Sequence, residues 1–248
     1  QGYSSAASDV YKRQGMDSAA ITDHGVMYGV IDFYRAAKAA GIKPVIGCEV
    51  YVARRTRFDK DHTLDSNPYH LILLCKNEEG YRNLIHMVSL SFAEGFYNKP
   101  RIDWQLLEQY HEGLIAMSAC LAGEVASKIL QQNYEGAKQT ALAYRALFGE
   151  DYYLEIQDHH LTEDDDVCRG VMRIAEETGI PLVATNDAHY TRKEDAHMQD
   201  VLMCIQTGKT VDDIDRMRFE TEEFYLKSEE EMAALFPKPV SYTHLTAA

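Results

Sequence analysis

The sequence predicts a mixed α/β fold whose sheet is mainly parallel. Short segments rich in apolar and β-branched residues alternate repeatedly with segments of helical character. The connectors between them are short, which is typical of strand–helix–strand units in parallel sheets. A length of 248 residues fits one large α/β unit and is compatible with closure of the sheet into a barrel.

The expected strands are short apolar runs bounded by glycine, proline or polar residues. Glu49 lies in the middle of one such run, and the run that begins at Ile180 ends in a polar tip at Asp187 and His189. The expected strands are residues 18–22, 45–52, 69–75, 114–117, 152–157 and 180–184.

The segments between these strands show apolar stripes and capping residues that predict helices. Gly41 ends the first helix, and Ser228 with Glu231 forms a capping box for the last. The charged segment 53–67 is interpreted as a surface loop. The other expected N-caps are Asn77, Asp103 and Thr162. The expected helices are residues 30–40, the segment from 78 onward, and residues 103–110, 121–132, 134–148, 162–178, 193–206 and 228–235.

Composition excludes several classes of protein. The five cysteines are odd in number and widely spaced, which argues against a disulfide framework and against a zinc ribbon. A net charge of −14 disfavours a tight, autonomous nucleic-acid binder. No apolar run approaches the roughly 18 residues of a membrane helix, and residues 1–14 have no signal-peptide core. We therefore expect no membrane partner and a cytoplasmic location.

Residues of metal-ligating type lie in or just after successive expected strands. The carboxyl ends of parallel strands meet on one face of a sheet, where ligands bind. The sequence therefore predicts that these side chains converge on one site. The candidate ligands are His24, Glu49, His70, Cys120, Asp187 and His189.

Taken singly, each candidate also has a structural interpretation. His24 could be a turn histidine, and Glu49 could form a buried salt bridge. His70 and Cys120 could be ordinary core residues. As a set, they favour a metal cluster.

The geometry of extended chains refines two of these assignments. Asp187 and His189 share a face if the strand remains extended through its tip. Adjacent residues point to opposite faces, so we expect His24 to be the ligand and Asp23 to stand behind it.

The expected ligand set suggests both the metal and the reaction. Imidazole, carboxylate and thiolate donors together suit Zn²⁺, Mn²⁺ or Fe²⁺ better than Ca²⁺ or Mg²⁺. Metal centres with bridging carboxylates are typical of hydrolytic sites that act on phosphoesters. Phosphoester hydrolysis is therefore the expected reaction class.

The chain resembles the PHP (polymerase and histidinol phosphatase) family, in the form found at the N-terminus of bacterial replicative DNA polymerase III alpha subunits. The segments that carry the resemblance run in the family's order and spacing. They are ITDHG (21–25), AGIKPVIGCEVYVA (40–53), YHLILL (69–74), GLIAMSACLAGE (113–124), LEIQDH (154–159) and VATNDAHY (183–190). KTVDDIDRMRFETEEFYLKSEEEM (209–232) is similar to the segment that leads toward the polymerase palm and favours the polymerase over free-standing PHP phosphatases.

The resemblance implies a distorted (β/α)7 barrel, here missing its first strand, with up to three divalent metal ions in a complete domain. It also implies a phosphoesterase or 3′–5′ exonuclease activity. The six candidate ligands fall on matching positions, and Asp187, His189 and Glu49 are expected to be catalytic as well. Asp23 is expected behind the ligands. Gln157, Asp158 and His159 are expected to line the rim and meet the substrate, with an ordinary surface loop as the alternative. The family's opening His-x-His pair has no match in residues 1–14.

These expectations divide the chain into four parts. Residues 1–14 and 240–248 are expected to be a non-native leader and tail, so His244 is not counted as a site residue. Residues 15–205 are expected to be the PHP domain, and 206–239 a connector toward an absent palm. The chain is thus not expected to polymerise nucleotides alone. DNA, the polymerase core and replisome subunits are the expected partners of the whole protein. The alternatives are a non-catalytic, metal-stabilised scaffold domain and a free-standing PHP phosphatase.

Overall fold

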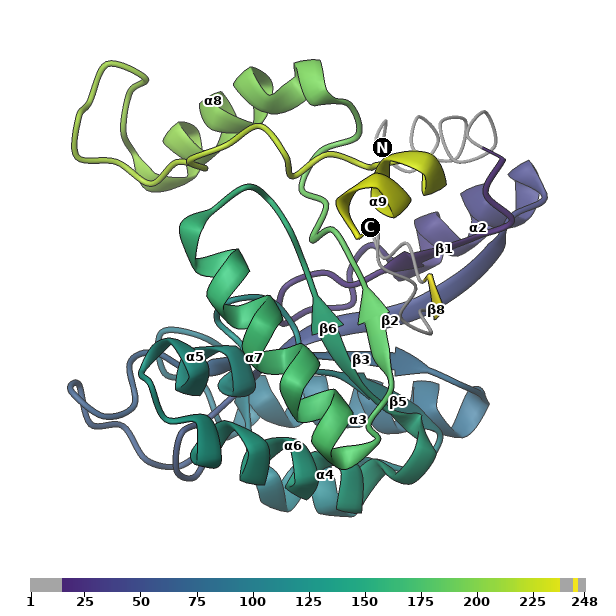
Figure 1. Cartoon of the computed structure of the whole chain (residues 1–248), viewed down its shortest axis with the longest axis vertical. Coiled ribbons are helices and arrows are strands. Elements are labelled where there is room, and N and C mark those ends of the chain that lie inside the picture. The colour runs from purple at the N-terminus through teal and green to yellow at the C-terminus, as the bar shows by residue number, and fades with distance from the viewer. Residues whose placement is uncertain (1–14, 237–242, 245–248) are drawn as a thin grey trace.

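A computed structural model describes residues 15–236 and 243–244 of the chain (Figure 1). The expected leader, 1–14, and most of the expected tail lie outside the described residues. The described strands form one sheet with the order β1-β2-β3-β5-β6-β7-β8, and β4 pairs separately with β2. The strands are β1 (Ser18–Ile21), β2 (Lys43–Val52), β3 (Tyr69–Cys75), β4 (Arg101–Ile102), β5 (Leu114–Met117), β6 (Tyr152–Ile156), β7 (Leu182–Ala184) and β8 (Thr243–His244).

The expectation of a mainly parallel sheet is confirmed, with one strand as the exception. β1 and β2 are parallel, as are β5, β6, β7 and β8 in succession. β3 runs antiparallel to both of its neighbours, β2 and β5. The segment between β2 and β3 contains no described helix that could carry the chain back across the sheet, so β3 returns alongside β2 in the opposite direction.

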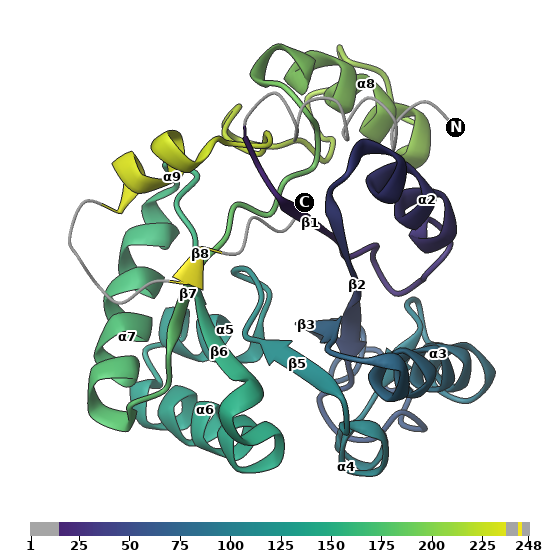
Figure 2. The same cartoon turned by 90° about the vertical axis from the view of Figure 1, so that its right-hand side faces the viewer.

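The helices lie along the outside of a curved sheet, so the mixed α/β class is also confirmed. In Figure 2 the strands curve around a common centre, and α2, α3, α4, α6 and α7 lie outside them. The helices are α2 (Val30–Ala40), α3 (Glu78–Ala93), α4 (Trp104–Tyr110), α5 (Glu124–Leu130), α6 (Tyr134–Phe148), α7 (Thr162–Thr178), α8 (Ala196–Thr207) and α9 (Glu229–Leu235), with 3₁₀ turns η1 (Gly149–Asp151) and η2 (Lys193–Asp195).

Most of the expected caps are present. Asn77 and Asp103 accept hydrogen bonds from the backbone N–H groups of Gly80 and Leu106, and Ser228 caps α9. The expectation for α7 was wrong, because Thr162 is the first helical residue and Leu161 occupies the N-cap position. The Asp164 carboxylate in the first turn accepts from Leu161 N at 3.2 Å, which is the reciprocal hydrogen bond of a capping box.

Alternation along the strands separates an outer core from an inner one. Leu71, Leu73 and Leu154 are buried in the large cluster between the sheet and its helices. Ile72 and Val183 belong to a second cluster on the concave side. Each buried side chain of this size stabilises the fold by roughly 2 kcal/mol through apolar burial. No helix in residues 15–236 is both long and apolar enough to cross a bilayer.

Candidate functional site

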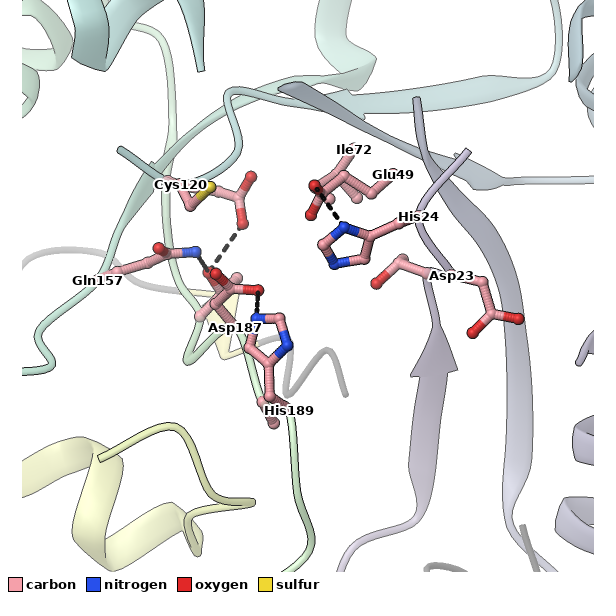
Figure 3. Close-up of a pocket in the computed structure, with 12 residues that line it drawn as sticks. Asp23, His24, Glu49, Ile72, Cys120, Gln157, Asp187 and His189 are labelled. Carbon is pink, nitrogen blue, oxygen red and sulfur yellow. Dashed lines mark hydrogen bonds and ion pairs between the residues drawn. The ribbon is translucent and has the colours of Figure 1, made fainter. Parts of the chain in front are cut away.

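A cavity of about 210 Å³ lies where the parallel strands end (Figure 3). Residues that follow β1, β5, β6 and β7 line it, together with residues from within β2, β3 and β6. The lining residues are Thr22, Asp23, His24, Glu49, Ile72, Cys120, Glu155, Gln157, Thr185, Asp187, Ala188 and His189.

The pleat of β2 directs Glu49 into this cavity. Cys48 and Val50, its neighbours, are buried in the outer core, so the side chain between them must point to the concave face. Glu49 is only 3% exposed. A carboxylate this buried is costly unless it has a cation or several hydrogen-bond donors.

Two histidines surround the Glu49 carboxylate. Oε1 of Glu49 is 2.6 Å from Nδ1 of His70 and 3.6 Å from Nδ1 of His24. Neither contact has the geometry of a hydrogen bond, and no other group in the described part of the chain donates to this oxygen. A buried, unsatisfied carboxylate oxygen beside two imidazole nitrogens has the donor chemistry of a transition-metal site.

Cys120 adds a thiol to the same wall. Its Sγ is 3.6 Å from Nδ1 of His70, and burial raises the pKa of the thiol well above its ordinary value. The turn that carries Cys120 has Ala119 at φ 63°, a left-handed conformation that is uncommon for alanine. A Cβ atom at Gly123 would lie 2.1 Å from the carbonyl oxygen of Ser118, so this tight turn requires glycine.

Asp187 and His189 form the opposite wall. Nε2 of His189 is 3.3 Å from Oδ1 of Asp187. The expectation that the strand stays extended through Asp187 and His189 was wrong. β7 ends at Ala184, and Asp187 has φ 44°, so these two residues lie in a turn. Burial raises the pKa of Asp187, but its hydrogen bond from His189 and nearby histidines outweigh burial and hold that pKa below its ordinary value. Burial lowers the pKa of His189, whereas Asp187 raises it and dominates.

A later segment of the chain holds this turn in place. His189 N donates to the carbonyl of Phe224 at 2.8 Å. The Asn186 side chain donates to the carbonyl of Tyr225 at 2.6 Å and accepts from Nζ of Lys227 at 3.1 Å. Residues 223–227, expected to be part of a connector, therefore pack directly against the loop that carries two candidate ligands.

The residues expected behind the ligands or at the rim have different positions. Asp23 and His24 both line the cavity, because β1 ends at Ile21 and the chain turns at Gly25, which has φ 67°. The Asp23 carboxylate accepts a hydrogen bond from Gly29 N at 3.1 Å and points away from His24 in Figure 3, so its place behind the ligand stays a prediction.

Asp158 and His159 do not line the cavity. Oδ1 of Asp158 accepts from His160 N at 2.9 Å. His159 is 2% exposed, and its ring stacks on that of Phe224 with the ring centroids 4.0 Å apart. Its Nε2 lies 2.8 Å from the carbonyl oxygen of Asn186. His159 thus lies behind the Asp187 turn and supports it.

Glu155 is the main lining residue that the sequence analysis missed. It lies in β6 between Leu154 and Ile156, both buried in the outer core, and points to the cavity. The signal that identified Glu49, a carboxylate inside an apolar strand, was equally present here. Burial raises the pKa of Glu155 to about 7; hydrogen bonds from Thr185 and Ala119 oppose this, and the charges of Asp187 and Glu49 add to it.

The structure thus brings five of the six candidate ligands to the cavity lining: His24, Glu49, Cys120, Asp187 and His189. His70 does not line the cavity but contacts two of them, Glu49 and Cys120. The ring centroids of His24 and His189 are 5.7 Å apart. Within residues 15–236 and 243–244, no three His, Cys, Asp or Glu side chains are grouped as ligands of a single ion. They are instead arranged as contacts with one another, such as Glu49 with His70. The donor types and the unsatisfied Glu49 oxygen nevertheless fit a divalent transition metal.

Comparisons with known proteins give a consistent family. A DNA polymerase III subunit alpha from Treponema pallidum is 50% identical over 228 residues, and one from Borreliella burgdorferi is 48% identical over 226. Each alignment covers 91% of this chain but 20% of the relative, so the chain spans about a fifth of the length of these relatives. An amidohydrolase from Chromobacterium violaceum aligns at 12% identity with a TM-score of 0.45, over 74% of this chain and 80% of that one, a likeness too weak to carry an argument. The PHP domain model matches residues 6–159. The chain therefore belongs to the PHP domain family.

Proposed function

We propose that this chain is the metal-dependent phosphoesterase module of a bacterial DNA polymerase III alpha subunit, and that it acts as a 3′–5′ exonuclease. The observation that carries the proposal is the cavity in which Glu49, with an unsatisfied carboxylate oxygen, faces imidazole, thiol and carboxylate side chains from other strands. The identity to the polymerase subunits supports the polymerase context.

The residues that would hold the metal are the six candidate ligands. They suit Zn²⁺ or Mn²⁺, and also Fe²⁺, with up to three ions in a complete domain. When bound, such ions supply Lewis-acid activation of water and of phosphoryl oxygens. The ligand residues would be His24, Glu49, His70, Cys120, Asp187 and His189.

Asp187, His189 and Glu49 would also act on the substrate. The Asp187–His189 pair is half-buried and joins a carboxylate to an imidazole whose pKa is raised, so it can hold a proton beside the cavity. Where this pair is not bound to an ion, it is suited to protonate a leaving oxygen.

The proposal extends to the whole protein. Nucleotide polymerisation, DNA binding and contacts with replisome subunits would belong mainly to regions outside residues 15–239. Within this chain, we propose that 15–205 is the PHP domain and that 206–239 leads toward the polymerase.

The test uses the full-length polymerase and a primer with a mismatched 3′ end. With Mn²⁺ or Zn²⁺ the protein should shorten the primer, and Asp187→Ala should abolish shortening while polymerisation is much less affected. Unchanged nuclease activity in Asp187→Ala would remove the site assignment. Bound metal without nuclease activity in the wild type would instead identify a metal-stabilised scaffold. Hydrolysis of small phosphoesters but not of primers would identify a free-standing type of phosphatase.

A further inference from the structure

Glu155 occupies a distinctive place in the cavity, because it lies on the strand between the two loops that carry Cys120 and Asp187. β6 pairs with β5 on one side and with β7 on the other. The side chain is 4% exposed and lines the cavity. A carboxylate at this position can reach both flanking loops.

Each oxygen of the Glu155 carboxylate accepts a hydrogen bond from a different loop. Oε2 accepts from the backbone N–H of Ala119, and Oε1 accepts from Oγ1 of Thr185 at 2.8 Å. The backbone N–H of Glu155 also donates to Oγ of Ser118 at 2.8 Å. Glu155 thus connects the loop that follows β5 (residues 118–123) with the loop that follows β7 (residues 185–189).

These contacts are made where the regular strand pairing ends. The last paired residues are Met117 with Tyr153 on one side and Ile156 with Ala184 on the other. Ala119 directly precedes Cys120 and has a left-handed backbone, and Thr185 is two residues before Asp187. A hydrogen bond at each of these points constrains the direction in which the following side chain leaves the sheet.

The contrast with Glu49 indicates what kind of role Glu155 has. Among the described residues, Oε1 of Glu49 contacts histidine nitrogens but accepts no hydrogen bond of regular geometry, whereas both oxygens of Glu155 accept hydrogen bonds from the protein. A group whose acceptor capacity is directed at the loops supports other groups instead of binding a ligand itself.

We propose that Glu155 is a positioning residue that fixes the separation of Cys120 and Asp187 across the cavity. The inference rests on the proposed function, in which those two side chains are ligands. The positions of the two loops can be measured without metal.

The experiment compares variants of the full chain by amide hydrogen exchange in EDTA, and then by Co²⁺ absorption. Glu155→Ala removes both acceptors. Glu155→Gln preserves the shape, because its oxygen can accept from Ala119 N while its amide donates to Thr185 Oγ1. Val171→Ala, in the buried face of α7, is the control for a general loss of stability.

We expect Glu155→Ala to speed exchange about tenfold in residues 118–123 and 184–189, as loss of a hydrogen bond implies, with little change elsewhere. Glu155→Gln should restore exchange close to that of the wild type. In Co²⁺-loaded protein, Glu155→Ala should weaken binding about tenfold and reduce the thiolate-to-cobalt absorption of Cys120. If Glu155→Ala does not fold, Thr185→Val should speed exchange in residues 184–189 and leave 118–123 unchanged.

Several outcomes would overturn the proposal. The first is an unchanged amide exchange rate of the two loops in Glu155→Ala, and the second is an equal increase of that rate in Val171→Ala. The third is a Glu155→Gln variant whose loops still exchange as fast as those of Glu155→Ala. The fourth is a Thr185→Val variant in which the exchange rates of both loops rise equally or do not change. If wild-type protein binds no Co²⁺, the proposed metal function fails, and the exchange data still decide whether Glu155 positions the loops.

Discussion

Glu49 of β2 and His70 of β3 meet diagonally across an antiparallel strand pair, with Oε1 of Glu49 2.6 Å from Nδ1 of His70. In the register Glu49 stands directly opposite Ile72, and His70 opposite Tyr51. Diagonal neighbours lie on the same face of a sheet and within reach of long side chains. The antiparallel course of β3 therefore places an imidazole beside the most buried carboxylate of the cavity wall.

Glu49→Gln should separate metal binding from stability. The change removes a buried charge but keeps the shape of the side chain and a polar group that can still contact Nδ1 of His70, so the free energy of unfolding of the metal-free protein should change little. The increase in melting temperature that Zn²⁺ or Mn²⁺ gives the wild type should be reduced, because binding to the folded state alone is what raises it. Thermal unfolding in EDTA and in metal provides the measurement.

A matched control exists in α5. Glu124→Gln makes the same chemical change at a carboxylate paired with Lys128, away from the cavity lining. It should leave the metal-dependent increase intact. An equal loss of that increase in both variants would argue against Glu49 as a ligand.

Cys120→Ser should change which metal the cavity prefers. A thiolate favours Zn²⁺, and a hydroxyl is a harder and weaker ligand, so Zn²⁺ affinity should fall about tenfold or more while Mn²⁺ affinity falls less. Competition titrations followed by metal analysis would measure the ratio. Cys75→Ser, at the far end of β3, is the control. A Zn²⁺/Mn²⁺ preference that is the same in both variants would exclude the thiol from the site.

The stability of the metal-free protein should depend on pH through Glu155. Its pKa is raised from 4.5 to about 7 in the folded state, so between these values the folded protein holds a proton that the unfolded chain has lost. The stabilisation from this group is present below pH 4.5, declines as pH rises to 7, and amounts to about 3 kcal/mol at most. Glu155→Gln cannot titrate and should flatten the curve in this window.

Urea unfolding in EDTA at several pH values would provide this test. The difference between wild type and Glu155→Gln isolates the one group from the Asp187–His189 pair. A difference that stays constant from pH 4.5 to 7 would show that Glu155 keeps an ordinary pKa.

Asn186→Ala should lower both stability and metal affinity. The side chain ties the Asp187 turn to the carbonyls of Glu223 and Tyr225 and to Lys227. Loss of these buried contacts should cost about 1–3 kcal/mol and loosen the turn that carries Asp187. Chemical unfolding and metal titration would measure the two effects.

Asn133→Ala offers a comparison of similar cost at a different place. Its side chain caps α6 by accepting from Gly136 N at 3.0 Å, and loss of such a cap costs about 1 kcal/mol. Metal affinity should be unchanged in this variant. If Asn186→Ala also left metal affinity unchanged, residues 223–227 would have no influence on the site.

Local patterns were sufficient for most of the fold. Short apolar runs bounded by turn residues identified the six longer strands, and short polar side chains such as Asn77 and Asp103 marked the starts of helices. The two-residue strand β4 was missed because Arg101 and Ile102 form no apolar run, and only their pairing with Tyr51 and Val52 defines it. Thr162 was wrongly expected to be a cap because the helix begins one residue earlier than the polar side chain suggested, with Leu161 at the N-cap position and Thr162 inside the first turn.

The sequence by itself determined the types of side chain available at the strand ends, since ligand chemistry belongs to the residue. It also determined that Glu49 lies between two apolar residues of a strand, so that its side chain points to the face opposite theirs. Only the tertiary structure decided how these side chains meet. The turns at Asp23 and Asp187, the diagonal approach of His70, and the support from residues 223–227 and Glu155 depend on contacts between segments far apart in the chain. Local periodicity carries no information about such contacts, because their energies arise only when the sheet has assembled.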